Sequence, residues 1–268
     1  MNKKISSLSI ILPTLNEKEN LEILIPSIRE KLNKLKIDNY EILVVDDGSQ
    51  DGTQAYVEQI ILDSNSVRLL SRTTEKSLPK SIYYGIKSSK SEFVMWLDAD
   101  GSMDADAIEK LILTISEKQE AIIVGSRFIE GGGYKGQNAE KKLSLINYFM
   151  KISNSEDSIV AILLSKYFNK LIGSLLSIGI KDLTSGFIIG KRKYFMTEEI
   201  FSRSVYGEYF IYLMKFLNNN KIEIVEVPYV CKPRLSGYSK TSTNYFSLLK
   251  LSVPVSYTHL RAHETDSY

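Results

Sequence analysis

Short apolar runs alternate with amphipathic stretches along the first half of the chain. In residues 18–35 the apolar positions recur every three or four residues, which is the spacing of one helical face. The runs between such stretches are shorter and end at proline, glycine or aspartate, which is typical of buried strands. Strands are predicted within residues 8–17, 40–53, 67–72, 92–100 and 121–128, and helices within 18–35, 53–64, 77–90 and 103–117.

This alternation predicts an α/β fold with a mostly parallel sheet flanked by helices. Ligands of such folds collect in the loops after the carboxyl ends of the strands. After a glycine-rich loop at 128–137 the alternation stops, and 159–180 is predicted as a helix with a broad apolar face. That face fits either a core helix or a helix lying in a membrane interface. A late strand is predicted within 223–234.

The composition agrees with a soluble α/β protein. A hydrophobic share of 43% is ordinary for a soluble core. No run approaches the roughly 18 consecutive apolar residues of a membrane-spanning helix. The single cysteine, Cys231, excludes an internal disulfide, which fits a reducing compartment.

The end of the sequence differs in character from the rest of the chain. We divide the chain into a catalytic domain at 1–242, the start of a truncated juxtamembrane helix at 243–254, and a terminal segment at 255–268. The terminal segment resembles the translation of a transposase sequencing adapter, and a genuine polar tail is the alternative. Both histidines, His259 and His263, lie in it, so the remaining chain offers no histidine for catalysis.

Four aspartates occupy nine positions after the fourth predicted strand: Asp98, Asp100, Asp104 and Asp106. Asp98 and Asp100 flank Ala99 at the end of the strand, so both carboxylates can reach one hard divalent cation. Mg²⁺ and Mn²⁺ prefer such oxygen ligands and keep positions open for phosphate oxygens. Asp104 and Asp106 begin the next predicted helix, where a negative charge interacts favourably with the helix dipole.

Three further polar clusters follow predicted strands. The first is "LPTLNEKENL", with Pro13, Thr14, Asn16 and Glu17; the second is "VVDDGSQDGT", with Asp46, Asp47 and Ser49; the third is "CKPRLSGYSK", with Lys232, Arg234 and Lys240. Each alone has a structural explanation, as a helix cap, a tight turn or a solvated basic loop. Three cations beside a glycine also suit a phosphate group.

Together the clusters form one ordered pattern: Pro-Thr-x-Asn-Glu, Asp-Asp-Gly-Ser-x-Asp-Gly-Thr, Asp-Ala-Asp, Thr-Ser-Gly-Phe and Arg-x-x-Gly-x-Ser-Lys. The chain resembles family 2 glycosyltransferases, and among them the dolichyl- and polyprenyl-phosphate mannosyl- and glucosyltransferases. The resemblance covers residues 8–242. It implies a GT-A type nucleotide-binding fold and metal-dependent, inverting transfer of a hexose from a nucleotide sugar to a polyprenyl phosphate.

The resemblance also implies roles for individual residues. On the donor side they are Pro13, Thr14, Asn16 and Glu17 around the nucleotide, Asp46, Asp47 and Ser49 near base and ribose, and Asp98, Ala99 and Asp100 at Mg²⁺ or Mn²⁺ and the diphosphate. On the acceptor side, Asp182 and the motif at 184–187 would line the sugar. Arg127, Arg234 and Lys240 would neutralise the acceptor phosphate or the leaving diphosphate.

The expected partners are a GDP- or UDP-hexose, a polyprenyl phosphate and a membrane surface, with no nucleic acid. The expected location is the cytoplasmic membrane face, with peripheral attachment or with C-terminal helices that this sequence lacks. A lipid phosphate is already ionised at pH 7, so its attack requires positioning and cations more than a base. A saccharide hydroxyl acceptor would need a carboxylate base, for which Asp182 and Glu208 are the candidates.

Some positions depart from the family pattern and leave alternatives open. Ser102 replaces a glutamine that usually adds a metal contact, and "SLPKS" at 77–81 replaces a glycine-rich turn. These departures motivate the alternative of a non-catalytic nucleotide-binding scaffold. "FVMWLDADGS" also matches the opening motif of haloacid-dehalogenase phosphatases, in which Asp98 would be the nucleophile and Asp100 the acid.

Overall fold

The computed structural model describes residues 5–134, 159–204 and 206–234. The strands are β1 (Leu8–Thr14), β2 (Tyr40–Asp46), β3 (Val67–Ser71), β4 (Phe93–Trp96), β5 (Ile122–Ser126), β6 (Gly133–Tyr134), β7 (Ile188–Lys191), β8 (Ile224–Pro228) and β9 (Val230–Cys231). The helices are α1 (Lys18–Lys34), α2 (Thr53–Asp63), α3 (Leu78–Ser88), α4 (Ala105–Glu117), α6 (Ile159–Leu176), α7 (Glu198–Arg203) and α8 (Glu208–Asn219), with a 3₁₀ turn, η1, at Arg192–Phe195.

The chain divides into two compact units, one of residues 1–137 with 169–237 and one of residues 138–168 with 238–268. All strands of the described residues belong to the first unit, as do the described candidate site residues between Pro13 and Arg234, and α6 begins in the second. Among the described helices, none combines the length and the apolar character that crossing a bilayer requires.

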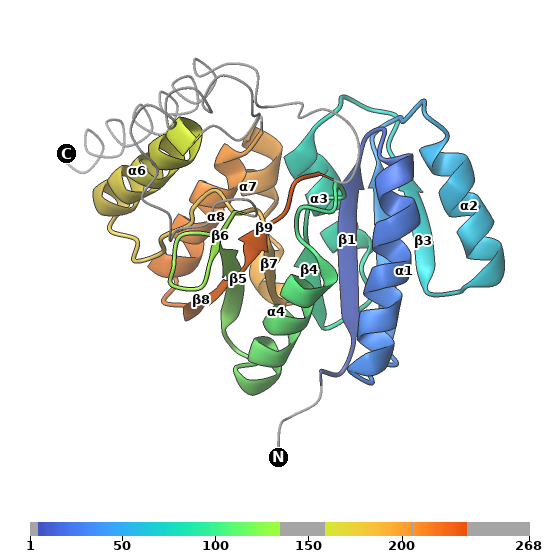
Figure 1. Ribbon diagram of the computed structural model, residues 1–268, viewed down its shortest axis with the longest axis horizontal. Helices are drawn as coiled ribbons and strands as arrows, with labels where there is room; N and C mark the ends of the chain where they lie inside the picture. Colours follow the sequence, from blue (N-terminus) through green and yellow to red (C-terminus); the bar gives the residue numbers. More distant parts are fainter. Residues whose placement is uncertain (1–4, 135–158, 205, 235–268) are drawn as a thin grey trace, which may run out of the picture. The chain divides into compact units, whose positions relative to one another are not determined.

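Seven strands form one sheet in the order β3-β2-β1-β4-β7-β5-β8. All neighbours in it are parallel except β7, which runs antiparallel to both β4 and β5. Helices α1, α2 and α4 cover one face, and α3, α7 and α8 cover the other (Figure 1). The predicted α/β fold with a mostly parallel sheet is therefore confirmed. A separate two-stranded sheet pairs β6 with β9 in parallel.

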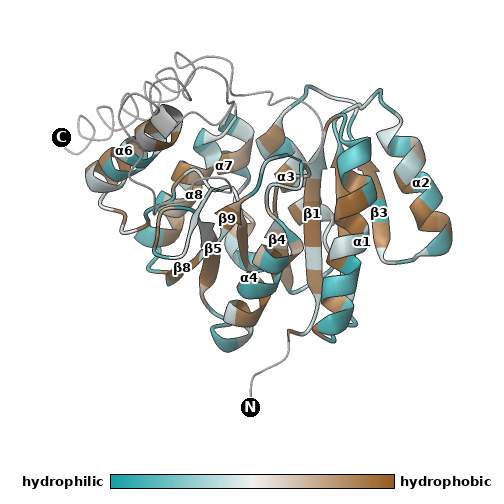
Figure 2. Cartoon of the chain, viewed as in Figure 1, coloured by the Kyte–Doolittle hydropathy of each residue, from teal (hydrophilic) through white to brown (hydrophobic). Residues whose placement is uncertain are grey.

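Because helices cover both faces, the central strands are buried on both sides and read as continuous apolar runs. Every residue of β4 and β5 is buried, and in β1 only Pro13 is partly exposed. The flanking helices are apolar toward the sheet and polar outward (Figure 2). In α4, for example, Ile108, Leu111 and Ile115 are buried, while the carboxylate of Asp104 caps the helix by accepting a hydrogen bond from the Ala107 N–H at 3.0 Å.

Gly125 in β5 permits a close contact in the core beside the site. A Cβ atom there would lie 2.5 Å from Cδ1 of Phe187, whose ring is fully buried. We expect Gly125→Ala to lower the free energy of unfolding by about 1–3 kcal/mol, because overpacking forces neighbours out of their rotamers. Urea unfolding measures it, with Gly179→Ala as the matched control, since no atom lies within 4 Å of that added methyl group. Equal stability of the two variants would contradict the contact.

Candidate active site

The predicted donor-side residues meet at one edge of the sheet. Thr14, the last residue of β1, is in register with Asp46, the last residue of β2. β4 pairs with the other side of β1 and ends at Trp96, two residues before Asp98. The carboxyl ends of three adjacent parallel strands therefore carry three of the predicted clusters, which is the position at which such sheets bind ligands.

The loops after β1 and β2 are tied together by Asn16 and Ser49. The Asn16 N–H donates to Ser49 Oγ at 2.7 Å, and Asn16 Oδ1 accepts from the Gln50 N–H at 2.8 Å. The Lys18 N–H donates to Asp51 Oδ2 at 3.0 Å, which closes the junction. Asn16 has a φ of 54°, a left-handed conformation that asparagine tolerates better than most residues. In the structure, Asn16 and Ser49 thus shape the loop pair around the predicted nucleotide position.

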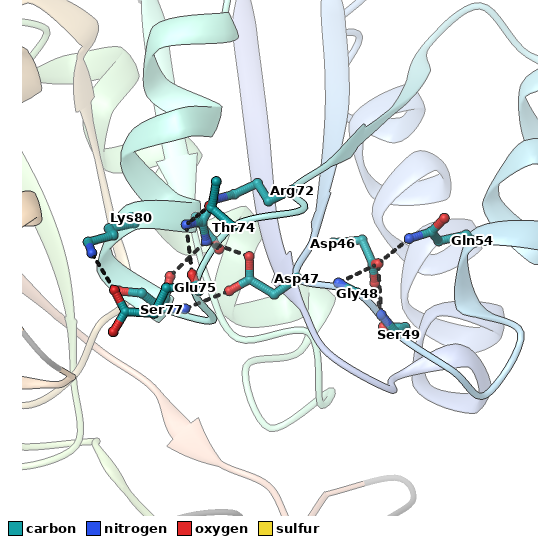
Figure 3. Close-up of polar contacts among 11 residues, drawn as sticks. Asp46, Asp47, Gly48, Ser49, Gln54, Arg72, Thr74, Glu75, Ser77 and Lys80 are labelled. Carbon is teal, nitrogen blue, oxygen red and sulfur yellow. Dashed lines mark hydrogen bonds and ion pairs between the residues drawn. The ribbon is translucent and has the colours of Figure 1, made fainter.

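Asp46 is fully buried, and its carboxylate organises its own loop (Figure 3). Oδ2 accepts from the Gly48 and Ser49 N–H groups at 3.0 Å each and from Gln54 Nε2 at 2.6 Å. Oδ1 accepts from the Ser49 hydroxyl. Four donors on one carboxylate make Asp46 a fixed point of the loop.

Asp47 forms an ion pair with Arg72, a residue that the sequence did not single out. Both side chains are 8% exposed, and Asp47 Oδ2 also accepts from the Ser77 N–H at 2.9 Å. Arg72 donates further to the Ser77 and Glu75 carbonyls, at 3.2 and 3.1 Å, and to Thr74 Oγ1 at 3.2 Å (Figure 3). Asp47 is therefore oriented by the segment between β3 and α3, which contains the start of the unusual "SLPKS" turn.

Asp98 and Asp100 share their surroundings with Arg234 and Glu17. Asp100 is 5% exposed, accepts from the Ser102 N–H at 2.9 Å, and lies 3.2 Å from Arg234 Nη2. Arg234 Nη1 lies 3.8 Å from Glu17 Oε1. Burial, and after it the charge of Asp100, raise the pKa of Asp98 to about 7, although the charge of Arg234 opposes the rise. The structure thus brings together Glu17 from the loop after β1, the two aspartates of the Asp-Ala-Asp motif, and Arg234 from the basic loop.

The donor set at Asp98 and Asp100 fits a divalent cation that also binds a substrate phosphate. Within the described ranges there is no group of three or more His, Cys, Asp or Glu side chains arranged for a metal. Mg²⁺ is usually bound by only one or two carboxylates together with phosphate oxygens and water. The two aspartates match that requirement. Ser102, which stands where the family usually has a glutamine, donates its backbone N–H to Asp100.

Arg127 and Asp182 form a buried, forked ion pair. Arg127 Nε and Nη2 each donate to one oxygen of Asp182 at 2.8 Å, and the Arg127 N–H donates to the same carboxylate at 2.9 Å. Asp182 is fully buried, while Arg127 also donates to Thr184 Oγ1 at 3.0 Å. The Arg127 guanidinium lies 5.3 Å from the ring centre of Phe128 and 5.5 Å from that of Tyr134. Asp182 therefore fixes the orientation of Arg127.

Two residues that the sequence analysis missed hold the segment containing Asp182. Glu226 in β8 accepts from the Lys181 and Asp182 N–H groups at 3.0 and 3.1 Å. Asn169 in α6 accepts from the Leu183 N–H at 2.6 Å and donates to Thr184 Oγ1 at 3.1 Å. Asn169 is a polar residue within the mostly apolar run at 159–180, and this contrast could have marked it. Glu226 offered none beyond its position in a strand.

The remaining predicted residues lie in less specific surroundings. Thr14 Oγ1 donates to the Leu12 carbonyl at 2.8 Å, and Pro13 is a partly exposed residue of β1. Ala99 is buried between the two aspartates. Glu208 is buried at the start of α8 and accepts from the Tyr206 N–H at 3.0 Å. Lys240, like residues 243–268, lies outside the described residues.

The family assignment rests on the match of a family model, described as glycosyl transferase family 2, to residues 9–197. This range contains the loops after β1, β2 and β4 as well as Arg127 and Asp182. The chain belongs to glycosyl transferase family 2. The phosphatase interpretation of Asp98 is thereby replaced, because the same aspartates lie in a glycosyltransferase domain.

Among curated glycosyltransferase relatives, a dolichol-phosphate mannosyltransferase of Pyrococcus furiosus is 32% identical over 233 residues, covering 87% of this chain and 58% of the relative. A polyprenol monophosphomannose synthase of Mycolicibacterium smegmatis is 28% identical over 239 residues, covering 87% of this chain and 80% of the relative. The chain therefore spans under two thirds of the length of the first of these relatives.

Solved structures with this glycosyltransferase fold include glucosyl-3-phosphoglycerate synthase from Mycobacterium tuberculosis. Its complex with Mn²⁺, UDP and glucosyl-3-phosphoglycerate superposes with a TM-score of 0.57 at 15% identity, covering 95% of this chain and 79% of that one. Its complex with Mg²⁺ and UDP has a TM-score of 0.53 at 14% identity and covers 87% of this chain and 72% of that one. At this identity the likeness shows the fold alone, and that fold is GT-A.

Proposed function

We propose that this glycosyltransferase moves one hexose from a GDP- or UDP-sugar to a polyprenyl phosphate. The observation that carries the proposal is the meeting of Asp98, Asp100 and Arg234 at the carboxyl edge of the sheet, where their charges suit a diphosphate bound with a divalent cation. Relatives named for dolichol-phosphate and polyprenol-monophosphate mannose transfer support the acceptor class, and they make mannose the first sugar to test.

In this proposal Asp98 and Asp100 bind Mg²⁺ or Mn²⁺ together with the donor diphosphate. Metal complexes of a protein with the same fold support this role. When bound, the metal would neutralise charge that develops on the departing diphosphate. Asn16, Glu17, Asp46, Asp47 and Ser49 shape the nucleotide position.

Arg127 is proposed to present a cation to the acceptor phosphate. Asp182 acts by orienting Arg127, because its carboxylate already accepts three hydrogen bonds from that arginine. A phosphate monoester is ionised at pH 7, so its oxygen can attack the anomeric carbon without a protein base. The role of the site is then positioning and charge neutralisation, which suits a chain whose residues 1–254 contain no histidine.

We place this reaction at a membrane surface, on the cytoplasmic side, where a soluble nucleotide sugar can meet a lipid acceptor. The apolar face of α6, with Leu171 and Leu175 exposed, is consistent with contact to such a surface.

The test is a transfer assay that crosses GDP-mannose and UDP-glucose with dolichyl and undecaprenyl phosphate. We expect one donor to label one or both lipid phosphates in the presence of Mn²⁺, and chelation of the metal to stop the reaction. The unphosphorylated polyprenols are the matched control acceptors and should remain unlabelled. Transfer to a polyprenol or to a free saccharide, with none to the lipid phosphates, would overturn the acceptor assignment. Metal-dependent nucleotide binding without any transfer would favour the scaffold alternative.

A further inference from the structure

Arg234 lies where a cation is needed if no metal is bound. Its guanidinium reaches Asp100 at 3.2 Å and Glu17 at 3.8 Å, so it bridges two carboxylates from different loops. Asp100 is almost completely buried, and the arginine side chain is itself only 27% exposed. An uncompensated carboxylate in such a position would be costly, so the ion pair stabilises the metal-free site.

The backbone holds the segment of Arg234 against this site. The Lys232 N–H donates to the Ser102 carbonyl at 2.9 Å, directly after the Asp-Ala-Asp motif. Lys232 also pairs with Asp104, the cap of α4. Upstream, β9 pairs with β6. The contacts of Lys232 therefore place Arg234 beside Asp100.

A metal ion and Arg234 cannot both neutralise Asp100 at full strength. When a divalent cation and a donor diphosphate arrive, they bring two positive and two negative charges to the same place. A diphosphate is a better partner for the guanidinium than a metal-bound carboxylate, because its oxygens match the arginine fork. The arginine can therefore exchange one anion for another with little movement.

We propose that Arg234 is a stand-in cation: it pairs with Asp100 in the metal-free protein and passes to the donor diphosphate when the metal binds. This deepens the proposed function, on which it rests. This exchange makes the binding of metal and nucleotide cooperative. A metal that binds alone must displace Arg234 from Asp100 without giving it another partner. A metal that binds with a diphosphate supplies that partner. The same coupling must appear in the affinity for either ligand.

The experiment measures Mn²⁺ affinity by the loss of the electron paramagnetic resonance signal of the free ion. Titrations are run on the wild type and Arg234→Gln, first without nucleotide and then with saturating GDP or UDP. Without nucleotide, Arg234→Gln should bind Mn²⁺ about 5-fold or more tightly than the wild type. The nucleoside diphosphate should raise the Mn²⁺ affinity of both proteins. The increase in the wild type should be at least about 5 times the increase in Arg234→Gln.

Three variants serve as controls. Arg234→Lys keeps the charge and should resemble the wild type without nucleotide. Lys118→Gln removes the same charge away from the site, where Lys118 forms an exposed pair with Glu223, and should change the affinity for Mn²⁺ alone by less than about 2-fold. Arg234→Met provides a second neutral side chain if the glutamine variant does not fold, as judged by thermal unfolding.

Two results would overturn the proposal. Mn²⁺ affinity without nucleotide that is unchanged or weaker in the neutral variants would refute competition for Asp100. An equal nucleotide effect in wild type and Arg234→Gln would refute the passage of Arg234 to the diphosphate. Neither readout involves an acceptor, so a failed lipid-transfer assay leaves this test intact.

Discussion

Asp100→Asn is expected to reduce hexose transfer at least about 100-fold while the protein remains folded. The amide keeps the shape of the side chain but removes the negative charge that would bind the metal and that pairs with Arg234 at 3.2 Å. Initial rates of transfer at saturating donor measure the loss. Mn²⁺ affinity in the presence of nucleotide should fall in parallel, because the same carboxylate serves both.

The matched control is Asp106→Asn, which makes the same chemical change a few residues later. Asp106 has a side chain that is 76% exposed and pairs with Lys31 at 2.9 Å on the surface of α4. Its replacement should leave the transfer rate within about 2-fold of the wild type, since Asp106 is exposed and Lys31 keeps its second ion pair with Glu109 at 2.7 Å. Full activity of Asp100→Asn would refute the metal-binding role of the Asp-Ala-Asp motif.

Asp182→Ala should lower the free energy of unfolding by about 3–5 kcal/mol, because it leaves the guanidinium of Arg127 buried without its partner. Urea unfolding measures the change. Glu199→Ala is the control for loss of an ion pair at the surface: Glu199 pairs with Arg203 where both side chains are more than half exposed. That variant should lose less than about 1 kcal/mol.

A double variant separates stability from activity. Replacing Arg127 with Met and Asp182 with Leu fills similar space without charge, and such exchanges of buried pairs often restore stability. We expect the double variant to recover most of the stability lost in Asp182→Ala but to remain inactive, because the cation proposed for the acceptor phosphate is gone. Recovery of transfer in this variant would show that the pair only supports the fold.

The first half of the fold could be predicted from sequence because its signals are local. All five strands expected between residues 8 and 128 exist as β1 to β5, and the four helices between them exist as α1 to α4. Parallel strands covered on both faces must be continuously apolar, and the covering helices must be amphipathic, so each element is marked in its own residues. The carboxyl-edge position of Asp46, Asp47, Asp98 and Asp100 follows directly from this order.

The second half carries weaker local signals. β7 has four residues, and its pairing with β4 and β5 depends on contacts about 60 to 100 positions away in the chain. β6 lies within the glycine-rich stretch that was predicted to be a loop, and it is a strand only because β9 pairs with it. Such elements are decided by tertiary partners, which a single sequence does not display.

Arg72 illustrates the same limit in the site. It is one arginine among many, and its importance arises from the pairing of β2 with β3, which places Ser71 in register with Asp46. The next residue of each strand is then Arg72 and Asp47. A reading that combined strand order with the residues just beyond each strand end could have found this pair. Charge and motif alone could not.

The reversed direction of β7 has a consequence for where acceptor-side residues occur in the chain. Ile188, the first residue of β7, lies beside Trp96, the last residue of β4. The residues directly before β7 therefore lie at the carboxyl edge of the parallel strands, whereas the residues after β7 lie at the opposite edge. Residues 182–187, which we propose for the acceptor side, come directly before a strand, whereas each motif proposed for the donor side follows one. An insertion just before β7 would therefore change the proposed acceptor side without interrupting the loops after β1, β2 and β4.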